Sequence, residues 1–174
     1  LFSYTMVVFL GLVIHASVTY SLALKFFVGY SLRRFFRGIK SAQIFAFSSS
    51  SSSATLPVTM RICQENLGVS KEVSSFVLPL GTTINMDGTA LYQGVAAYFI
   101  AQVSGLTLTL GDQITIVLTA TLASIGTAGV PGVGLIMLIL VLEAIGLNES
   151  SISQGIALIL GVDRLIDMCR TVVN

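Results

Sequence analysis

Long apolar runs fill most of the chain, and several of them are interrupted halfway by residues that do not belong in a continuous helix. Segments 1–29, 70–105 and 150–174 are each long enough to cross a hydrocarbon core, which takes about 20 helical residues. Hydrophobic residues make up 54% of the 174 residues and charged residues only 10%, whereas roughly a quarter of an ordinary soluble domain is charged. The runs therefore exclude a soluble domain and predict an all-α integral membrane protein.

Two further segments have the pattern of a helix pair. In segment 112–146 the apolar run is interrupted by Gly126–Gly132, where Pro131 lacks an amide donor and the glycines favour turns. Each arm then has about 13 residues, or about 20 Å of helix, too short for a hydrocarbon core of about 30 Å. We therefore predict a re-entrant helical hairpin. Segment 30–66, broken at Ser48–Ser53, repeats the pattern and predicts a second one.

Six consecutive serines, Ser48–Ser53, form the expected tip of the first hairpin. On composition alone a flexible linker fits this run equally well. Its flanks, Ile44–Phe47 and Leu56–Val58, are mostly apolar, and irregular backbone at membrane depth occurs only where it is buried in protein or lines a water-filled cavity. The context therefore favours a tip whose hydroxyls and amides serve as ligand donors.

Basic residues concentrate around the first hairpin: Lys25, Arg33, Arg34, Arg37, Lys40, Arg61 and Lys71. The connections 104–112 and 144–151 contain no Lys or Arg. Because cytoplasmic loops carry the excess of Lys and Arg, we expect the first hairpin to enter from the cytoplasm and the second from outside. Hairpin plus spanning helix then occurs twice with opposite polarity, and such inverted repeats are typical of secondary transporters. The basic residues are expected to face anionic lipid rather than nucleic acid.

A stripe of polar residues runs along segment 150–174. Its members recur at helical spacing and project from one face of the helix; they are Asp163, Asp167, Arg170, Thr171 and Asn174. An ionisable group at the bilayer centre costs about 3 kcal/mol on insertion scales. We therefore expect the stripe to line a cavity or bind a ligand.

The motif Asn85–Thr89 interrupts segment 70–105 in its middle. A carboxylate at Asp87 beside Gly88 is expected to open the helix and to free the carbonyls of Gly81, Thr83 and Asn85. Several such oxygens suit a hard monovalent cation, and residues 124–127 of the second tip would add more. The alternative is a helix kink whose free backbone groups are hydrogen-bonded by neighbouring side chains. It explains Gly88 but leaves Asp87 without a counter-charge.

The remaining reactive side chains give little indication of chemistry. His15 stands in an apolar run without a partner at helical spacing, so we expect it to pack. Cys63 and Cys169 form no disulfide framework and no metal-ligand cluster.

Four strings, in this order, resemble the glutamate transporter family, the dicarboxylate/amino acid:cation symporters: Ser51–Pro57, Asn85–Thr89, Ala123–Gly132 and Asp163–Asn174. The resemblance covers essentially the whole chain and corresponds to the C-terminal part of that family. Because the chain begins in an apolar run and stops within a helix, we expect it to be a fragment. The resemblance implies a multi-pass protein of the cell membrane, assembled as a homotrimer in which a mobile transport domain moves against a fixed scaffold, the elevator mechanism.

The implied function is transport, not catalysis: sodium entry is coupled to uptake of L-aspartate or L-glutamate. The alternative is a proton-coupled C4-dicarboxylate or neutral amino acid symporter. Arg170 would grip the substrate side-chain carboxylate and Asp167 the α-ammonium. The implied substrate residues are Ser52, Thr89, Gly129, Val130, Asp167, Arg170, Thr171 and Asn174. Sodium ions would be held by Gly81, Asn85, Asp87 and Asn174 in one region and by Thr83, Ser124, Ile125 and Thr127 in another.

The chain departs from the family pattern in three respects. Ser50 and Met168 stand where many relatives have an arginine, and Arg164 is close by in sequence, either replacing that arginine in space or altering turnover. Gln93 stands where vertebrate relatives have a glutamate associated with proton and potassium coupling, which favours a simpler sodium-driven cycle and leaves proton coupling open. The chain also stops one turn before an aspartate that completes a sodium site in relatives.

Two other classes of membrane protein fit parts of the pattern. An intramembrane aspartyl protease needs two carboxylates that share a proton, but Asp163 and Asp167 lie on one helix with Arg170, which would keep them ionised. An ion channel would explain polar tips at mid-depth, but Arg170 beside Asp167 fits a zwitterion clamp better than a selectivity ring. Saturable uptake against a gradient would separate these classes from a symporter.

Overall fold

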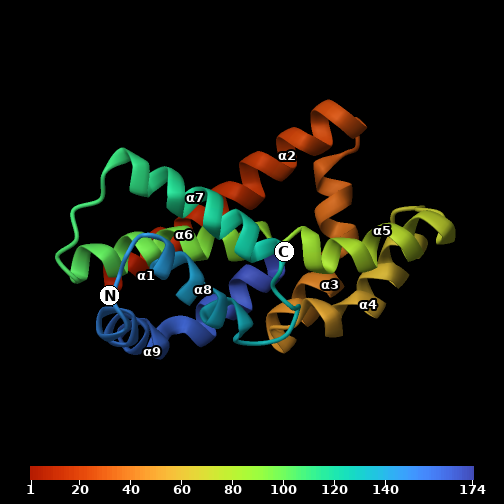
Figure 1. The fold of residues 1–174 in the computed structure, drawn as a ribbon. Coiled ribbons are helices and arrows are strands. Elements are labelled where there is room, and N and C mark those ends of the chain that lie inside the picture. The colour runs from red at the N-terminus through yellow and green to blue at the C-terminus, as the bar shows by residue number, and fades with distance from the viewer.

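The computed structural model describes residues 1–174, and all of its regular elements are helices (Figure 1). This confirms the all-α prediction. In chain order they are α1 (Phe2–Ile14), η1 (His15–Thr19), α2 (Tyr20–Ala23), η2 (Leu24–Val28), α3 (Leu32–Ser49), α4 (Ser52–Glu65), α5 (Lys71–Ile84), α6 (Asp87–Val103), α7 (Leu110–Ile125), α8 (Val133–Ala144) and α9 (Glu149–Val173).

The first four elements follow one another directly as a helix over Phe2–Val28, in which η1 and η2 are π-helical turns. By length and composition this is the one helix that is long and apolar enough to cross a membrane. Segments 70–105 and 150–174 are less uniform. The first is divided into α5 and α6, of 14 and 17 residues, and the 25-residue α9 contains the polar stripe.

The two helical hairpins turn at well-defined residues. Between α3 and α4, Ser50 adopts a left-handed conformation with φ of 50°, and the Ser51 hydroxyl caps α4 by accepting a bond from the Ala54 amide. The break is therefore shorter than the predicted Ser48–Ser53, because α3 continues through Ser49. Between α7 and α8 the chain is irregular from Gly126 to Gly132, as predicted.

An exposed capping box fixes the start of α7. The Thr109 hydroxyl and amide both donate to Asp112, at 2.7 and 2.8 Å. These bonds hold the pKa of the Asp112 carboxyl below its usual range. The Asp112 amide in turn donates to the Thr109 hydroxyl, so the first turn of α7 satisfies donors that a helix start leaves free.

Figure 1 shows α5 and α6 nearly end to end along the molecule. Helix α4 lies beside α5 and is paired with α3, and α7 and α8 lie beside α6. The C-terminal end of α9 lies between these two halves, close to the break between α5 and α6. Contacts of α9 with both α3 and α6 hold it there. The arrangement brings both hairpin tips to the polar end of α9.

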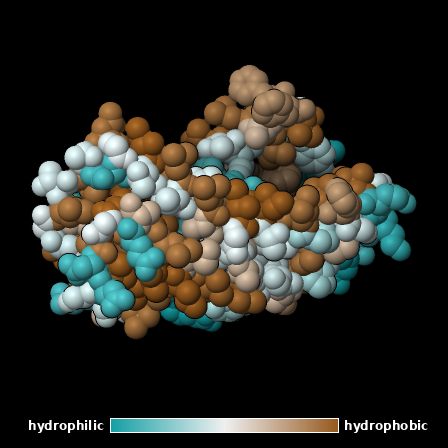
Figure 2. All heavy atoms as spheres, in the orientation of Figure 1, coloured by the Kyte–Doolittle hydropathy of each residue, from teal (hydrophilic) through white to brown (hydrophobic).

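The apolar core joins α1, α6, α8 and α9 through fully buried side chains that include Val8, Tyr92, Ile100, Leu138 and Ile159. Many large apolar side chains remain on the surface, among them those of α1 and α7. Figure 2 shows hydrophobic residues spread over much of one face, with hydrophilic residues gathered mainly toward the two ends. Apolar patches of this extent are unusual on soluble monomers and mark contact with lipid or protein.

Candidate functional site

The tips of the two helical hairpins touch each other. The Ser51 hydroxyl and the Ser53 amide both donate to the carbonyl of Gly129, at 2.7 and 3.0 Å. A Cβ on Gly129 would lie 2.8 Å from Ser53 Oγ and 3.0 Å from its amide nitrogen. Glycine therefore permits this approach, and the serine run of one hairpin is fixed against the glycine-rich tip of the other.

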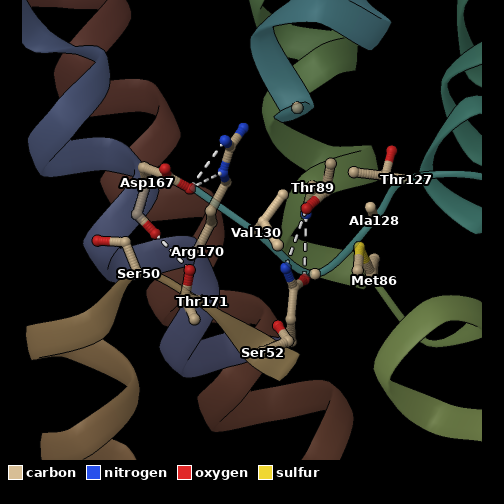
Figure 3. A pocket seen from close by; sticks show the side chains of 13 residues that line it. Ser50, Ser52, Met86, Thr89, Thr127, Ala128, Val130, Asp167, Arg170 and Thr171 are labelled. Atoms are coloured by element: carbon tan, nitrogen blue, oxygen red, sulfur yellow. Dashed lines mark hydrogen bonds and ion pairs between the residues drawn. The ribbon is translucent and has the colours of Figure 1, made fainter. Parts of the chain in front are cut away.

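A small cavity of about 10 Å³ lies where the tips meet α6 and α9 (Figure 3). This is room for about one water molecule. Its lining residues are Ser50, Ser52, Met86, Thr89, Thr127, Ala128, Gly129, Val130, Gly134, Asp167, Arg170, Thr171 and Asn174. The structure thus brings together all eight residues that the resemblance assigns to the substrate.

Arg170 and Asp167 form a buried ion pair in the wall of this cavity. Nε and Nη2 of Arg170 both lie 2.8 Å from Asp167 Oδ1, and the Gly132 amide donates to Asp167 Oδ2 at 2.9 Å. The two side chains are 3% and 6% exposed. Arg170 Nη1 has no partner. A buried guanidinium with an unused donor is suited to bind a second carboxylate.

The face of the Arg170 guanidinium rests on an aromatic ring. Its carbon Cζ lies 4.4 Å from the centroid of Tyr92, and the Tyr92 hydroxyl donates to Asp163 at 2.7 Å. Asp163 therefore does not line the cavity with the rest of the stripe but holds the ring on which Arg170 lies. A cation over a tyrosine face is attracted by its quadrupole, which restricts the guanidinium further.

The end of α9 is joined to the start of α6 by an amide side chain. Asn174 accepts a bond from the Thr89 amide at 3.2 Å and donates to the Thr89 hydroxyl at 2.9 Å. The Thr171 hydroxyl donates to the carbonyl of Asp167 at 2.7 Å. These bonds fix the position of the α9 residues that line the cavity.

Asp87 does have a potential counter-charge, contrary to the expectation from sequence. Its Oδ2 lies 3.3 Å from His15 Nε2 and accepts a bond from the Tyr20 hydroxyl at 3.1 Å. The packing role expected for His15 therefore includes a polar contact with a residue 72 positions away in sequence. The physical reason is η1, whose i to i+5 bonding places His15 and Tyr20 on one face, with ring centroids 4.9 Å apart.

The eight expected sodium ligands were assigned to two regions, and only two of the eight line the cavity. Asn174 and Thr127 line the cavity, whereas Asp87 faces the first helix and Thr83, Asn85 and Ile125 are exposed. The carbonyls of Gly81 and Ser124, expected to be free, accept bonds from the Asn85 and Thr127 amides at 3.0 and 3.1 Å. The Gly81 carbonyl keeps one lone pair for a cation, whereas the Gly126 amide also donates to the Ser124 carbonyl.

Two of the departures from the family pattern have defined positions. Arg164 is exposed and does not line the cavity, so it does not replace the missing arginine in space. Gln93 is fully buried, and its Nε2 donates to the carbonyl of Gly134 at 3.2 Å.

Three residues that line the cavity were not selected from the sequence: Gly134, Met86 and Ala128. Each of them lies within a motif that was selected, or just beyond one.

Comparison with known proteins agrees with these motifs. The model of the sodium:dicarboxylate symporter family matches residues 1–174. The chain is 51% identical over 173 residues to the excitatory amino acid transporter of Caenorhabditis elegans and 48% identical over 171 residues to human excitatory amino acid transporter 2. Each match covers 98% of this chain but only 33% and 29% of the relative. The resemblance to the glutamate transporters is thereby confirmed: the chain belongs to the sodium:dicarboxylate symporter family.

Proposed function

We propose that the protein containing this chain is a secondary active symporter that couples sodium entry to uptake of L-aspartate or L-glutamate. The observation that carries the proposal is the buried Arg170–Asp167 pair, with its unused guanidinium donor, where the hairpin tips meet. The relatives' description as excitatory amino acid transporters supports an acidic amino acid over the proton-coupled dicarboxylate or neutral amino acid alternative.

Both ends of an acidic amino acid have a partner in this cavity. Its side-chain carboxylate would bind Arg170 through the unused Nη1, and its α-ammonium would bind Asp167 in competition with the Gly132 amide. The cavity has room for only about one water molecule, so attraction between these charges is much stronger than in bulk water. The pair thus selects a substrate that has both charges.

Substrate entry requires one tip to move, because the cavity holds only about one water molecule. The tip between α7 and α8 is the natural gate. Gly132 in it has φ of 80°, a conformation that favours glycine, and glycines absorb the dihedral changes of opening. Substrate and sodium would stabilise the shut form by replacing bonds that now join the tip to Asp167 and Ser51.

For the membrane arrangement we propose the boundaries expected from the sequence. Segments 30–66 and 112–146 would be re-entrant hairpins entering from opposite sides, and the other three segments would span the cell membrane as parts of an inverted repeat. The exposed basic residues of α3 would face anionic lipid headgroups. A homotrimer with an elevator motion completes the proposal.

Uptake by the full-length protein in proteoliposomes tests this function. Labelled aspartate should accumulate with saturation under an inward sodium gradient, and unlabelled L-aspartate or L-glutamate should compete. Uptake driven equally well by a proton gradient, or blocked only by succinate, would favour the alternative symporter. Flux that does not saturate would indicate a channel.

Removing the charge of Asp87 tests the sodium site. Asp87→Asn keeps the shape of the side chain but removes the negative charge, so we expect the half-saturating sodium concentration to rise about tenfold, a change of about 1.4 kcal/mol. The measurement is a sodium titration of aspartate uptake. Asp112→Asn, at the exposed start of α7, is the matched control. Superimposable titrations of wild type and Asp87→Asn would exclude Asp87 as a cation ligand.

A further inference from the structure

The hydroxyl of Tyr20 lies between two helices that are distant from it in sequence. It is 3.1 Å from Asp87 Oδ2, in the first turn of α6, and 3.0 Å from the carbonyl of Val173, in the last turn of α9. A hydroxyl has a single proton and therefore donates to one of these oxygens at a time. Tyr20 thus contacts both the helix of the expected cation ligand and the helix of the expected substrate clamp.

The contacts of Asp87 are unequal at its two oxygens. Tyr20 and His15 both approach Oδ2, whereas Oδ1 has no hydrogen-bond partner in the protein. The Asp87 side chain is 37% exposed. The bonds to Oδ2 fix the rotation of the carboxylate and leave Oδ1 available. A cation that binds Oδ1 therefore does not have to order the side chain first, which reduces the free-energy cost of binding.

We propose that Tyr20 is a positioning residue for the coupling cation. Its hydroxyl holds Asp87 Oδ2 so that Oδ1 is oriented toward sodium, and the alternative acceptor of that hydroxyl is the Val173 carbonyl at the end of α9. This inference rests on the proposed sodium-coupled function and adds to it a residue outside the motifs that define the family resemblance. Tyr20 does not itself touch the substrate cavity.

The test removes only the hydroxyl. In the full-length protein, Tyr20→Phe is expected to raise the half-saturating sodium concentration about fivefold, the effect of losing one hydrogen bond of typical net strength. At saturating sodium, the KM for aspartate and the maximal uptake rate should stay at the wild-type values. Tyr98→Phe is the matched control, because Tyr98 lies on α6 and is 43% exposed.

The shift in the sodium titration caused by Tyr20→Phe should also depend on the carboxylate of Asp87. In an Asp87→Asn background, Tyr20→Phe is expected to cause no further shift in the sodium titration. A Tyr20→Phe titration that coincides with the wild type, a lower maximal rate with an unchanged sodium midpoint, or an equal shift in the Asp87→Asn background would each overturn the proposal. Wild-type uptake that does not depend on sodium would instead overturn the proposed function, so the two failures are distinguishable.

Discussion

Uptake of L-aspartate is expected to fall about 100-fold or more when Arg170 is replaced by threonine. The substitution removes the charged donors for the substrate carboxylate and leaves Asp167 buried without its ion-pair partner. Truncating one partner of a buried, hydrogen-bonded charge pair costs about 3 kcal/mol or more, and each 1.4 kcal/mol is about a tenfold change in affinity. The measurement is kcat/KM for labelled aspartate in proteoliposomes.

The same variant should change which substrates are accepted. Asp167 would still attract an α-ammonium, so Arg170→Thr is expected to admit neutral amino acids that lack the second carboxylate. Arg164→Thr is the matched control, since Arg164 lies on the same helix but is exposed and outside the cavity. Unchanged aspartate uptake by well-expressed Arg170→Thr protein would refute the clamp.

The breaks in the helices could be predicted because local chemistry determines them. Pro131 and the glycines around it cannot continue a helix, and Asp87 beside Gly88 marks the division between α5 and α6. The number of residues in a break depends less on local chemistry. Serine is tolerated in a helix, and α3 therefore continues through Ser49, with only Ser50 in the left-handed conformation.

The contacts of Asp87 could not be predicted because they depend on the geometry of a distant segment. His15 and Asp87 are 72 residues apart in sequence, and they meet only because a π-helical turn directs His15 and Tyr20 toward α6. No periodicity in the apolar run indicates that turn. The grouping of the expected substrate residues around the cavity, by contrast, follows from motifs that each mark a tip or a helix end.

Gly134→Ala is expected to reduce aspartate affinity about thirtyfold. A Cβ at this position would overlap Arg170 Nη1 and would lie 2.6 Å from Cζ. Either α8 must move away or the guanidinium must leave its bonds to Asp167, because Tyr92 occupies its other face. Overpacking of this kind costs about 2 kcal/mol, which corresponds to about thirtyfold in a binding constant.

Gly161→Ala is the control for Gly134→Ala, because a Cβ on Gly161 of α9 would meet no atom within 4 Å. The loss in Gly134→Ala should appear mainly in the KM for aspartate. Gln93, bonded to the Gly134 carbonyl, holds α8 in place, so relief of the clash by movement of the helix is opposed by a buried hydrogen bond. Wild-type KM values in Gly134→Ala would therefore mean that Arg170 binds the substrate in a position different from the one seen here.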